Sequence, residues 1–278
     1  MSRATRSHLA RAAAAILGLL VARAPGAGAQ ARANGFLDRS VTVGSETYRF
    51  QVYVPAKKAG RSLPIILWLH GNGAQGVDGS LPTRGAMGQR IRAGREPFPA
   101  IVVFPQARPD HLWDDSMQTV ALAALEAAIR EFRADRARTY LMGFSMGGRG
   151  AWWLASRQPE RFAAVVVIAG PVADIPVRLW STGQVETAMR ENAYLRSGDP
   201  FGTLAASLGK LPVWLFIGSA DPLAPPGDAR RMGEALRKVN PDARFTEYPG
   251  VGHDARRALA EKELWTWLLA RQRSPGRP

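Results

Sequence analysis

The residues best suited to chemistry in this chain form the pentapeptide Gly143-Phe144-Ser145-Met146-Gly147. An apolar run, Thr139–Met142, precedes it, and a helical pattern begins near Met146. A serine on such a strand-to-helix turn needs small residues two positions before and two positions after it, and the turn lifts its hydroxyl above the sheet. The adjacent helix N-terminus offers free N–H groups that favour developing negative charge. The pattern therefore predicts a nucleophile at Ser145. Without a strand before it and a helix after it, the same pentapeptide would be only a flexible loop.

A nucleophilic serine needs a base, and the chain has four histidines and no cysteine. Where a serine occupies this kind of turn, an acid and then a histidine follow it along the chain. His8, His70 and His111 all precede Ser145, so His253 is the only histidine in the required order. It stands in a glycine-rich loop before a predicted C-terminal helix. We predict that His253 is the general base.

The acid that orients the histidine is expected at the end of another strand, between Ser145 and His253 in the chain. Asp221 lies four residues after the apolar run Val213–Ile217, on a turn rich in glycine and proline. Asp228 and Asp242 are the competitors. Asp228 is expected to cap a helix that starts near residue 227, and Asp242 to lie in an Asn-Pro-Asp turn. Asp221 is therefore the predicted acid.

The segment His70-Gly71-Asn72-Gly73 follows the apolar run Ile65–Leu69. Its two glycines would let the loop fold under the serine and point backbone N–H groups at a bound carbonyl oxygen. The predicted oxyanion hole consists of the amide of Met146 and the amide of Asn72 or its neighbour. For His70 itself, a local hydrogen bond at the strand end is the simplest expectation.

The elements around these residues alternate between strands and helices. Residues 47–54 alternate in hydropathy, as a half-buried antiparallel strand does. Continuous apolar runs predict strands covered on both faces, and three- and four-residue spacing predicts helices between them. The runs are 65–69, 100–104, 139–142, 163–169 and 213–217, with a strand-like segment at 244–248, and the helices are 117–132, 146–157, 227–239 and 255–271. The fold class is α/β, with a mostly parallel central sheet and helices on both faces.

The segment 171–209 is too long for one crossover helix. We expect a helix at about 184–195 and a crossover helix that starts at Asp199-Pro200, because structureless loops of this length are uncommon. The segment could form a small cap over a pocket, carrying Trp180, Tyr194 and Phe201. Two packed helices without a role in binding are an equally good interpretation.

Residues 1–29 have the three parts of an export signal. Positive charge comes first, the apolar run 12–22 follows, and Ala27-Gly28-Ala29 is a small-x-small cleavage site. The run is about half the ~20 residues that span a bilayer, so no stable membrane anchor is expected. The sequence predicts a cleaved signal at 1–29, a single domain at 30–278, and a secreted or periplasmic protein. A second such site, Ala31-Arg32-Ala33, leaves the cleavage position open by a few residues.

The net charge of +14 at first suggests nucleic acid as a partner. However, only five of the 37 basic residues are lysine, and no block of five like charges occurs. No helix-turn-helix or aromatic-interleaved basic pattern is present, so we predict no nucleic-acid binding. No paired-histidine helix motif, phosphate loop or dinucleotide fingerprint is present either, so we predict no metal and no cofactor.

Taken together, these motifs resemble the α/β-hydrolase superfamily over nearly all of residues 45–270. The closer similarity is to secreted bacterial esterases of the dienelactone hydrolase, phospholipase/carboxylesterase and polyhydroxybutyrate depolymerase-like group. The resemblance rests on 69–73, 143–148 with Ala151-Trp152, 159–164, 218–221 and 248–253. It implies that the loop 111–115 lines the acyl side of the site, with Trp113 as a wall residue or simply a packed one. In this loop Asp114 and Asp115 would be helix caps. The long 171–209 segment departs from the family pattern.

The sequence therefore predicts a serine hydrolase that cleaves carboxylic esters through an acyl-enzyme, acting on short-chain, other small or oligomeric esters. Two alternatives stay open: a serine peptidase of the prolyl-oligopeptidase type, and a non-catalytic binding protein on the same fold. The sequence names neither the ester nor the oligomeric state.

Overall fold

The computed structural model describes residues 34–56, 62–173 and 181–273. The predicted export signal, both of its cleavage sites and Trp180 lie outside the described residues. Within them, no helix is both long enough and apolar enough to cross a membrane.

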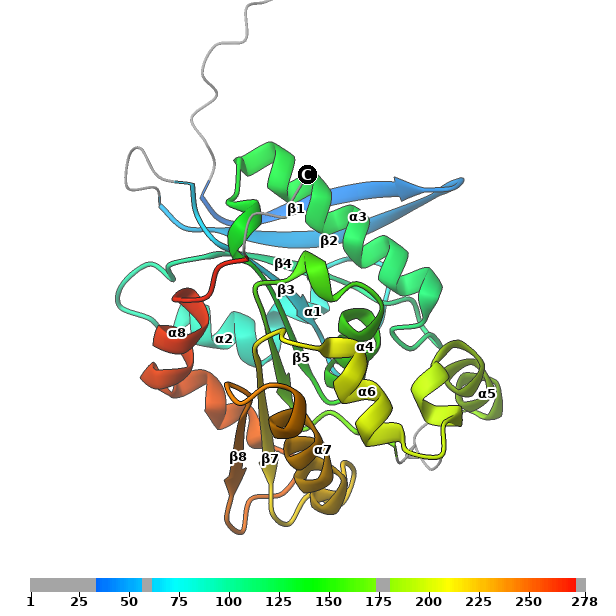
Figure 1. The fold of residues 1–278 in the computed structure, drawn as a ribbon. Helices are drawn as coiled ribbons and strands as arrows, with labels where there is room; N and C mark the ends of the chain where they lie inside the picture. The colour runs from blue at the N-terminus through cyan, green and yellow to red at the C-terminus, as the bar shows by residue number, and fades with distance from the viewer. Residues whose placement is uncertain (1–33, 57–61, 174–180, 274–278) are drawn as a thin grey trace, which may run out of the picture. The chain divides into compact units, whose positions relative to one another are not determined.

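The described residues contain one eight-stranded sheet (Figure 1), whose strands lie in the order β1-β2-β4-β3-β5-β6-β7-β8. The pairs β1–β2 and β2–β4 are antiparallel, and every other neighbouring pair is parallel. The strands are β1 (Gly35–Val43), β2 (Glu46–Val54), β3 (Ile65–Leu69), β4 (Ile101–Pro105), β5 (Thr139–Phe144), β6 (Ala164–Ile168), β7 (Val213–Gly218) and β8 (Arg244–Tyr248). Every residue of β3, β4, β6 and β7 is buried, as expected for parallel strands covered on both faces. The predicted mostly parallel α/β sheet is confirmed.

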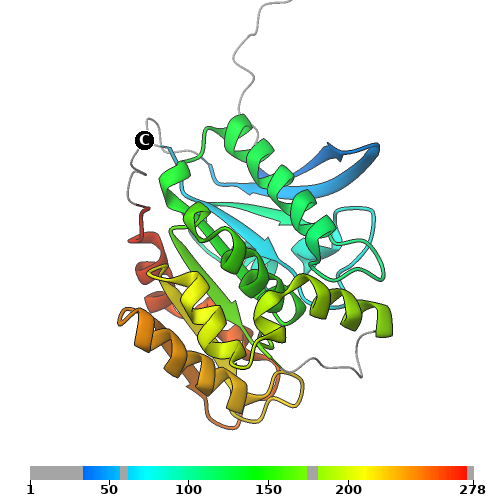
Figure 2. The ribbon, with the colours of Figure 1, turned by 45° about the vertical axis from the view of Figure 1, so that its right-hand side comes forward.

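Helices cover both faces of the sheet (Figures 1 and 2). On one face lie α3 (Asp115–Phe132), α4 (Met146–Arg157), α6 (Pro200–Leu208) and α7 (Pro226–Val239). The other face carries α1 (Leu81–Arg84), α2 (Ala86–Arg92) and α8 (Lys262–Leu269), while α5 (Thr182–Glu191) lies beyond α4. Short 3₁₀ helices span Arg136–Arg138, Pro159–Arg161, Ala193–Arg196 and Ala255–Ala260.

The structure differs from the sequence-based expectation in three regions. The sheet opens with a hairpin rather than a single strand, because β1 pairs with β2 across a turn at Gly44, where φ is 61°. The short helices α1 and α2 were not expected. The predicted helix 255–271 is two elements, since Glu261 is extended (φ −76°, ψ 123°) between the 3₁₀ helix and α8.

The segment 171–209 contains both helices that its length predicted. α5 begins at Thr182 and ends at Glu191, earlier than expected, and α6 begins at Pro200 and packs against α4 and α7. Tyr194 and Phe201 are each only 4% exposed, so these two side chains pack into the body of the protein. Phe201 and Tyr194 also contribute to two separate surface pockets, and the lining of neither pocket includes Ser145, Asp221 or His253.

Candidate active site

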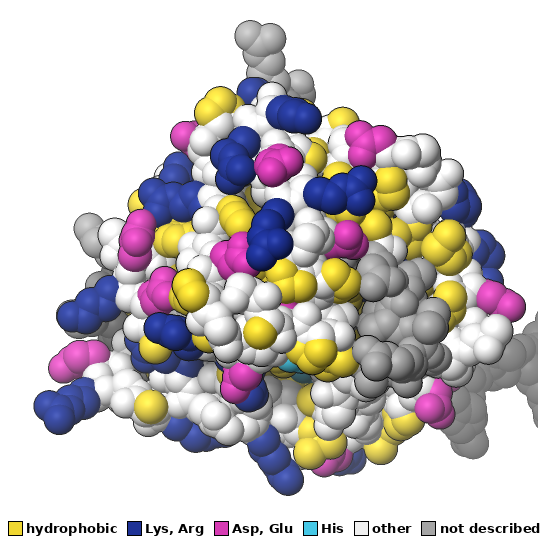
Figure 3. Space-filling view, turned by 90° about the horizontal axis from the view of Figure 1, so that it is seen from below, with side chains coloured by type: hydrophobic (Ala, Val, Ile, Leu, Met, Phe, Trp, Pro, Cys, Tyr) yellow, Lys and Arg dark blue, Asp and Glu magenta, His cyan; other side chains and the backbone are white. Residues whose placement is uncertain are grey.

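The parallel strands end at one edge of the sheet, which faces down in Figure 1 and towards the viewer in Figure 3. Loops that follow β3, β5, β7 and β8 at this edge carry His70, Ser145, Asp221 and His253. Open α/β sheets bind ligands in the crevice outside the carboxyl ends of their strands. All predicted site residues except Trp113 come directly from these loops or from the first residue of α4.

Ser145 occupies a strained turn between β5 and α4. Its φ of 55° and ψ of −118° are unusual for a residue with a side chain, and cost on the order of 1–3 kcal/mol. Packing enforces the turn: a Cβ on Gly143 would lie 2.1 Å from the Gly147 carbonyl oxygen, and one on Gly147 would lie 2.0 Å from that of Leu69. The Ser145 amide also donates to the Ile168 carbonyl on β6 (2.9 Å). Any side chain at position 143 or 147 would collide with backbone atoms, so the turn requires glycine at both positions.

The imidazole of His253 bridges the serine and a carboxylate. Its Nε2 lies 2.7 Å from the Ser145 Oγ. Its Nδ1 lies 3.0 and 2.9 Å from the two carboxylate oxygens of Asp221. A carboxylate can only accept, so Nδ1 carries the proton that is donated to Asp221, and the tautomer with its proton on Nδ1 leaves Nε2 to accept the serine proton.

Asp221 is fixed by its own turn. Its side chain is fully buried, and its Oδ1 accepts hydrogen bonds from the amides of Leu223 (2.8 Å) and Ala224 (2.9 Å). The Ala220 amide donates to the Val251 carbonyl (2.9 Å), which ties this turn to the His253 loop. The hydrogen bonds to Asp221 offset the free-energy cost of burying its carboxylate, and they hold the carboxylate against the Nδ1 side of the imidazole.

The two competing acids lie elsewhere. Asp228 is the third residue of α7, whose N-cap is Pro225, so the expectation that Asp228 caps this helix was wrong. The Asp242 amide donates to the Asn240 side chain (3.1 Å), in the turn that the sequence predicted.

The loop after β3 lies directly beside the serine turn. A Cβ on Gly71 would stand 2.9 Å from the Phe144 ring and 3.3 Å from the Phe144 carbonyl oxygen. Asn72 follows on this loop, and Met146 is the first residue of α4, where helical amides lack intrahelical partners. Among the described residues neither amide makes a hydrogen bond. Both are thus available to a substrate oxygen.

Two glutamines that the sequence analysis did not single out hold this loop. The Gln75 Nε2 donates to the Asn72 Oδ1 (2.8 Å) and contacts the Met146 sulfur (3.5 Å), while its Oε1 accepts from the Gly73 amide (2.8 Å). The buried Gln106 donates to the Ala74 carbonyl (3.0 Å). Gln75 thereby links both residues predicted to form the oxyanion hole.

His70 is a structural histidine. It is 3% exposed, its Nδ1 donates to the Gly71 carbonyl (2.8 Å), and its Nε2 accepts from the Ala107 amide (3.0 Å). Burial lowers the pKa of His70 to about 4, so the ring is neutral at physiological pH. The expected local hydrogen bond is present, together with a second one to the end of β4.

Trp113 is packed rather than exposed to a pocket. It is 1% exposed, and its Nε1 donates to the His70 carbonyl (3.0 Å). A Cβ on Gly150 of α4 would stand 2.5 Å from the Trp113 Cβ, so the residue is enclosed on that side too. A wall residue would present part of its ring to the substrate. The interpretation of Trp113 as substrate-binding is therefore corrected: it supports the His70 loop.

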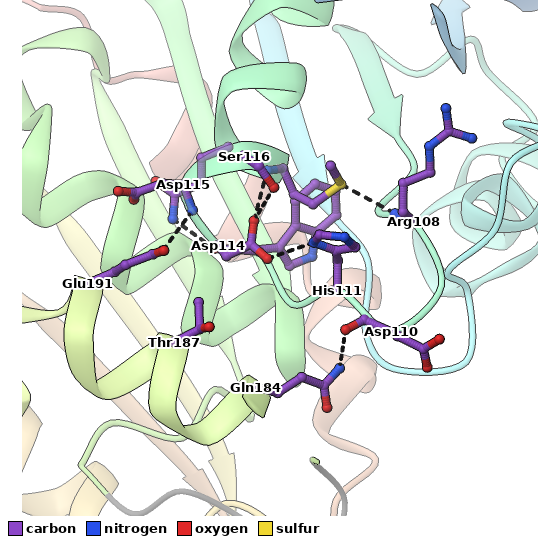
Figure 4. Close-up of polar contacts among 12 residues, drawn as sticks. Arg108, Asp110, His111, Asp114, Asp115, Ser116, Gln184, Thr187 and Glu191 are labelled. Atoms are coloured by element: carbon purple, nitrogen blue, oxygen red, sulfur yellow. Dashed lines mark hydrogen bonds and ion pairs between the residues drawn. The ribbon is translucent and has the colours of Figure 1, made fainter. Parts of the chain in front are cut away.

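The rest of the loop that precedes α3 is held by its own carboxylates and by α5 (Figure 4). Asp114 is the N-cap of α3 and accepts from the Met117 amide (3.0 Å), as predicted, and its second oxygen pairs with His111 (2.9 Å). Asp115 is the first helical residue rather than a cap. Its amide donates to Glu191 of α5 (3.0 Å), so α5 is anchored to this loop.

No group of three or more His, Cys, Asp or Glu side chains within the described residues could hold a metal ion. The arrangement around Ser145 instead places a hydroxyl, an imidazole and a buried carboxylate in one hydrogen-bonded chain. Such a set can deprotonate the hydroxyl as it attacks a carbonyl carbon.

A family model described as "Putative esterase" matches residues 40–267, which is most of the chain. The relative "Putative esterase NocK" from Nocardia uniformis subsp. tsuyamanensis is 27% identical over 230 residues, covering 75% of this chain and 65% of the relative. A solved thermostable esterase is 23% identical with a TM-score of 0.66, covering 86% of this chain and 63% of that one. The fluorophosphonate-binding serine hydrolase F of Staphylococcus aureus is 18% identical with a TM-score of 0.64, and the match covers 84% of this chain and 98% of that one. The chain thus spans just under two thirds of the first two proteins, and the solved structures share its fold.

Proposed function

Because this chain belongs to the esterase family of the α/β-hydrolase superfamily, we propose that it hydrolyses carboxylic esters through an acyl-enzyme on Ser145. The observation that carries the proposal is the continuous hydrogen-bonded path from the Ser145 Oγ through His253 to the buried Asp221. A structural serine would not need a strained turn, an imidazole in hydrogen-bond contact and a buried carboxylate together.

In the proposed mechanism, the Ser145 Oγ attacks the ester carbonyl carbon while the His253 Nε2 takes the hydroxyl proton. Asp221 keeps the other ring proton on Nδ1 and stabilises the imidazolium without taking a proton itself. The amides of Met146 and Asn72 donate to the oxygen that becomes negative, and each donor contributes about 3 kcal/mol of transition-state stabilisation. His253 then gives the proton to the departing alcohol. In the second half of the reaction, water attacks the acyl carbon while His253 takes its proton, and His253 returns that proton to the Ser145 oxygen as the carboxylic acid leaves.

A series of 4-nitrophenyl esters of increasing acyl length tests the proposal. We expect hydrolysis with a preference for short acyl groups. Release of aniline from a proline-linked anilide, with no ester cleaved, would favour a peptidase of the prolyl-oligopeptidase type. If neither ester nor anilide were cleaved, the non-catalytic binding protein would be the better interpretation. Faster turnover of long-chain esters would overturn the short-chain preference alone.

The position of Gln75 leads to a prediction about the oxyanion hole. Gln75→Leu removes the hydrogen bonds to Asn72 and Gly73 and the contact with Met146. Because a complete oxyanion donor is worth about 10²–10³ in kcat, we expect a partly misplaced one to cost about 10-fold to 100-fold in kcat, with KM within about 2-fold. Steady-state kinetics with a short-chain ester measures both constants.

The matched control is Gln272→Leu, at an exposed glutamine near the end of the described chain. It should leave kcat and KM at their wild-type values. A Gln75→Leu variant that raises KM with unchanged kcat would show that Gln75 serves ground-state binding and not the transition state.

A further inference from the structure

A groove with a volume of about 450 Å³ lies between α2 and the residues that follow His253 in the chain. One wall is α2, which contributes Gln89 and Arg90. The other wall is the 3₁₀ helix that follows the histidine, with Asp254, Arg256 and Arg257. Nothing in the proposed ester hydrolysis uses these side chains.

Two of the three arginines in the groove form no ion pair with a described residue. Arg256 forms a two-point ion pair with Asp254, with N–O distances of 2.6 and 2.8 Å, and this pair lowers the pKa of Asp254, so both stay charged and cancel. The Nε of Arg90 donates a hydrogen bond to the Leu259 carbonyl oxygen (2.9 Å). Arg257 stacks over the Tyr248 ring, 4.7 Å from its centre.

Within the described residues, neither Arg90 nor Arg257 has a carboxylate within 4.0 Å. The carboxylate of Glu261 accepts from the Tyr248 hydroxyl instead and is not part of the groove lining. The groove lining therefore includes two guanidinium groups, and guanidinium groups favour planar anions such as a carboxylate.

The groove lining is connected to the proposed catalytic histidine through one aromatic ring. The Arg256 guanidinium lies 5.3 Å from the centre of the Phe144 ring, and that ring lies 5.4 Å from the His253 ring. Phe144 directly precedes Ser145. Phe144 thus lies between Arg256, a residue of the groove lining, and the His253 ring.

We propose that this groove binds a carboxylate carried by the ester substrate, so that the enzyme favours anionic esters over neutral esters of the same length. The proposal rests on the ester hydrolysis proposed above. An exposed charge pair contributes about 0.2–1 kcal/mol, which is roughly 1.5-fold to 5-fold in binding for each arginine.

The experiment compares mono-4-nitrophenyl esters of succinate, glutarate and adipate with methyl-terminated esters of equal length. A second arm places the carboxylate on the alcohol part of the ester, and compares the butyrate ester of 3-hydroxybenzoate with phenyl butyrate. Together the two arms show whether the acyl part or the alcohol part of the ester enters the groove. Wild-type enzyme should favour at least one anionic ester, mainly through a lower KM, and the advantage should fall with added NaCl. Arg90→Gln with Arg257→Gln should reduce the ratio of anionic to neutral kcat/KM by about 2-fold to 20-fold.

The control Arg230→Gln removes the same charge on α7, where Arg230 pairs with Glu247, and should leave the ratio unchanged. Binding of the anionic esters to the Ser145→Ala variant, measured by calorimetry, separates the two proposals. If binding depends on Arg90 and Arg257, the groove assignment stands even where turnover is absent. If the wild-type enzyme hydrolyses neutral esters as well as anionic ones, or the double variant keeps the wild-type preference for anionic esters, the groove assignment is overturned and ester hydrolysis is not.

Discussion

Ser145→Ala and His253→Ala should each lower kcat for a short-chain ester by at least about 10⁴-fold, and combining them should cost little more. The two side chains are 2.7 Å apart and act in the same proton transfer, so removing either one removes the whole step. The residual rate would come from binding and from the oxyanion donors alone. Initial rates of the two single variants and the double variant measure this coupling.

The matched control is Ser156→Ala on the same helix. The Ser156 hydroxyl donates to the Trp153 carbonyl (2.8 Å) and has no place in the proposed mechanism, so this variant should keep wild-type kinetics. If the losses in the Ser145 and His253 variants multiplied in the double variant, the two residues would be acting independently, against the proposed proton transfer.

Gly147→Ala should destabilise the fold, because its Cβ would stand 2.0 Å from the Leu69 carbonyl oxygen and 2.6 Å from that of His70. Both are backbone atoms at the end of β3, so relief requires α4 to move away from the sheet. We expect a loss of about 3 kcal/mol in unfolding free energy and a Tm lower by roughly 6–12 °C. Thermal unfolding followed by circular dichroism measures this, and esterase activity should fall as the serine turn is displaced.

Gly227→Ala on α7 is the corresponding control. No atom lies within 4 Å of its added Cβ, so the substitution should leave stability unchanged or raise it by up to about 1 kcal/mol. Equal Tm values for Gly147→Ala and wild type would mean that α4 does not pack against β3 as closely as described.

Residues at strand ends were the most predictable part of the site. Ser145, Asp221 and His253 each follow a strand or strand-like segment. The Gly-x-Ser-x-Gly turn indicates the serine, chain order indicates the histidine, and a position after a strand indicates the acid; the three side chains are in contact in the structure. The buried parallel strands were predictable for the same reason: both faces are covered, and their sequences are continuously apolar.

Features that depend on side-chain contacts across the chain were not predictable. Gln75 contacts Met146, 71 residues away, and nothing local distinguishes it from an exposed loop glutamine. Trp113 is buried because Gly150 and His70 enclose it, which its loop sequence does not indicate. The edge strand β1 was missed because its side chains are only partly buried and its hydropathy pattern is weak. The export signal at 1–29 stays a prediction.

The most direct test of the central claim is the mass of the protein after reaction with a fluorophosphonate probe, which adds to an activated serine. We expect one adduct per chain, on the peptide that contains Ser145, no adduct in Ser145→Ala, and strongly slowed labelling in His253→Ala. An adduct on another residue, or none in a preparation that hydrolyses esters, would contradict the assignment of Ser145 as the nucleophile.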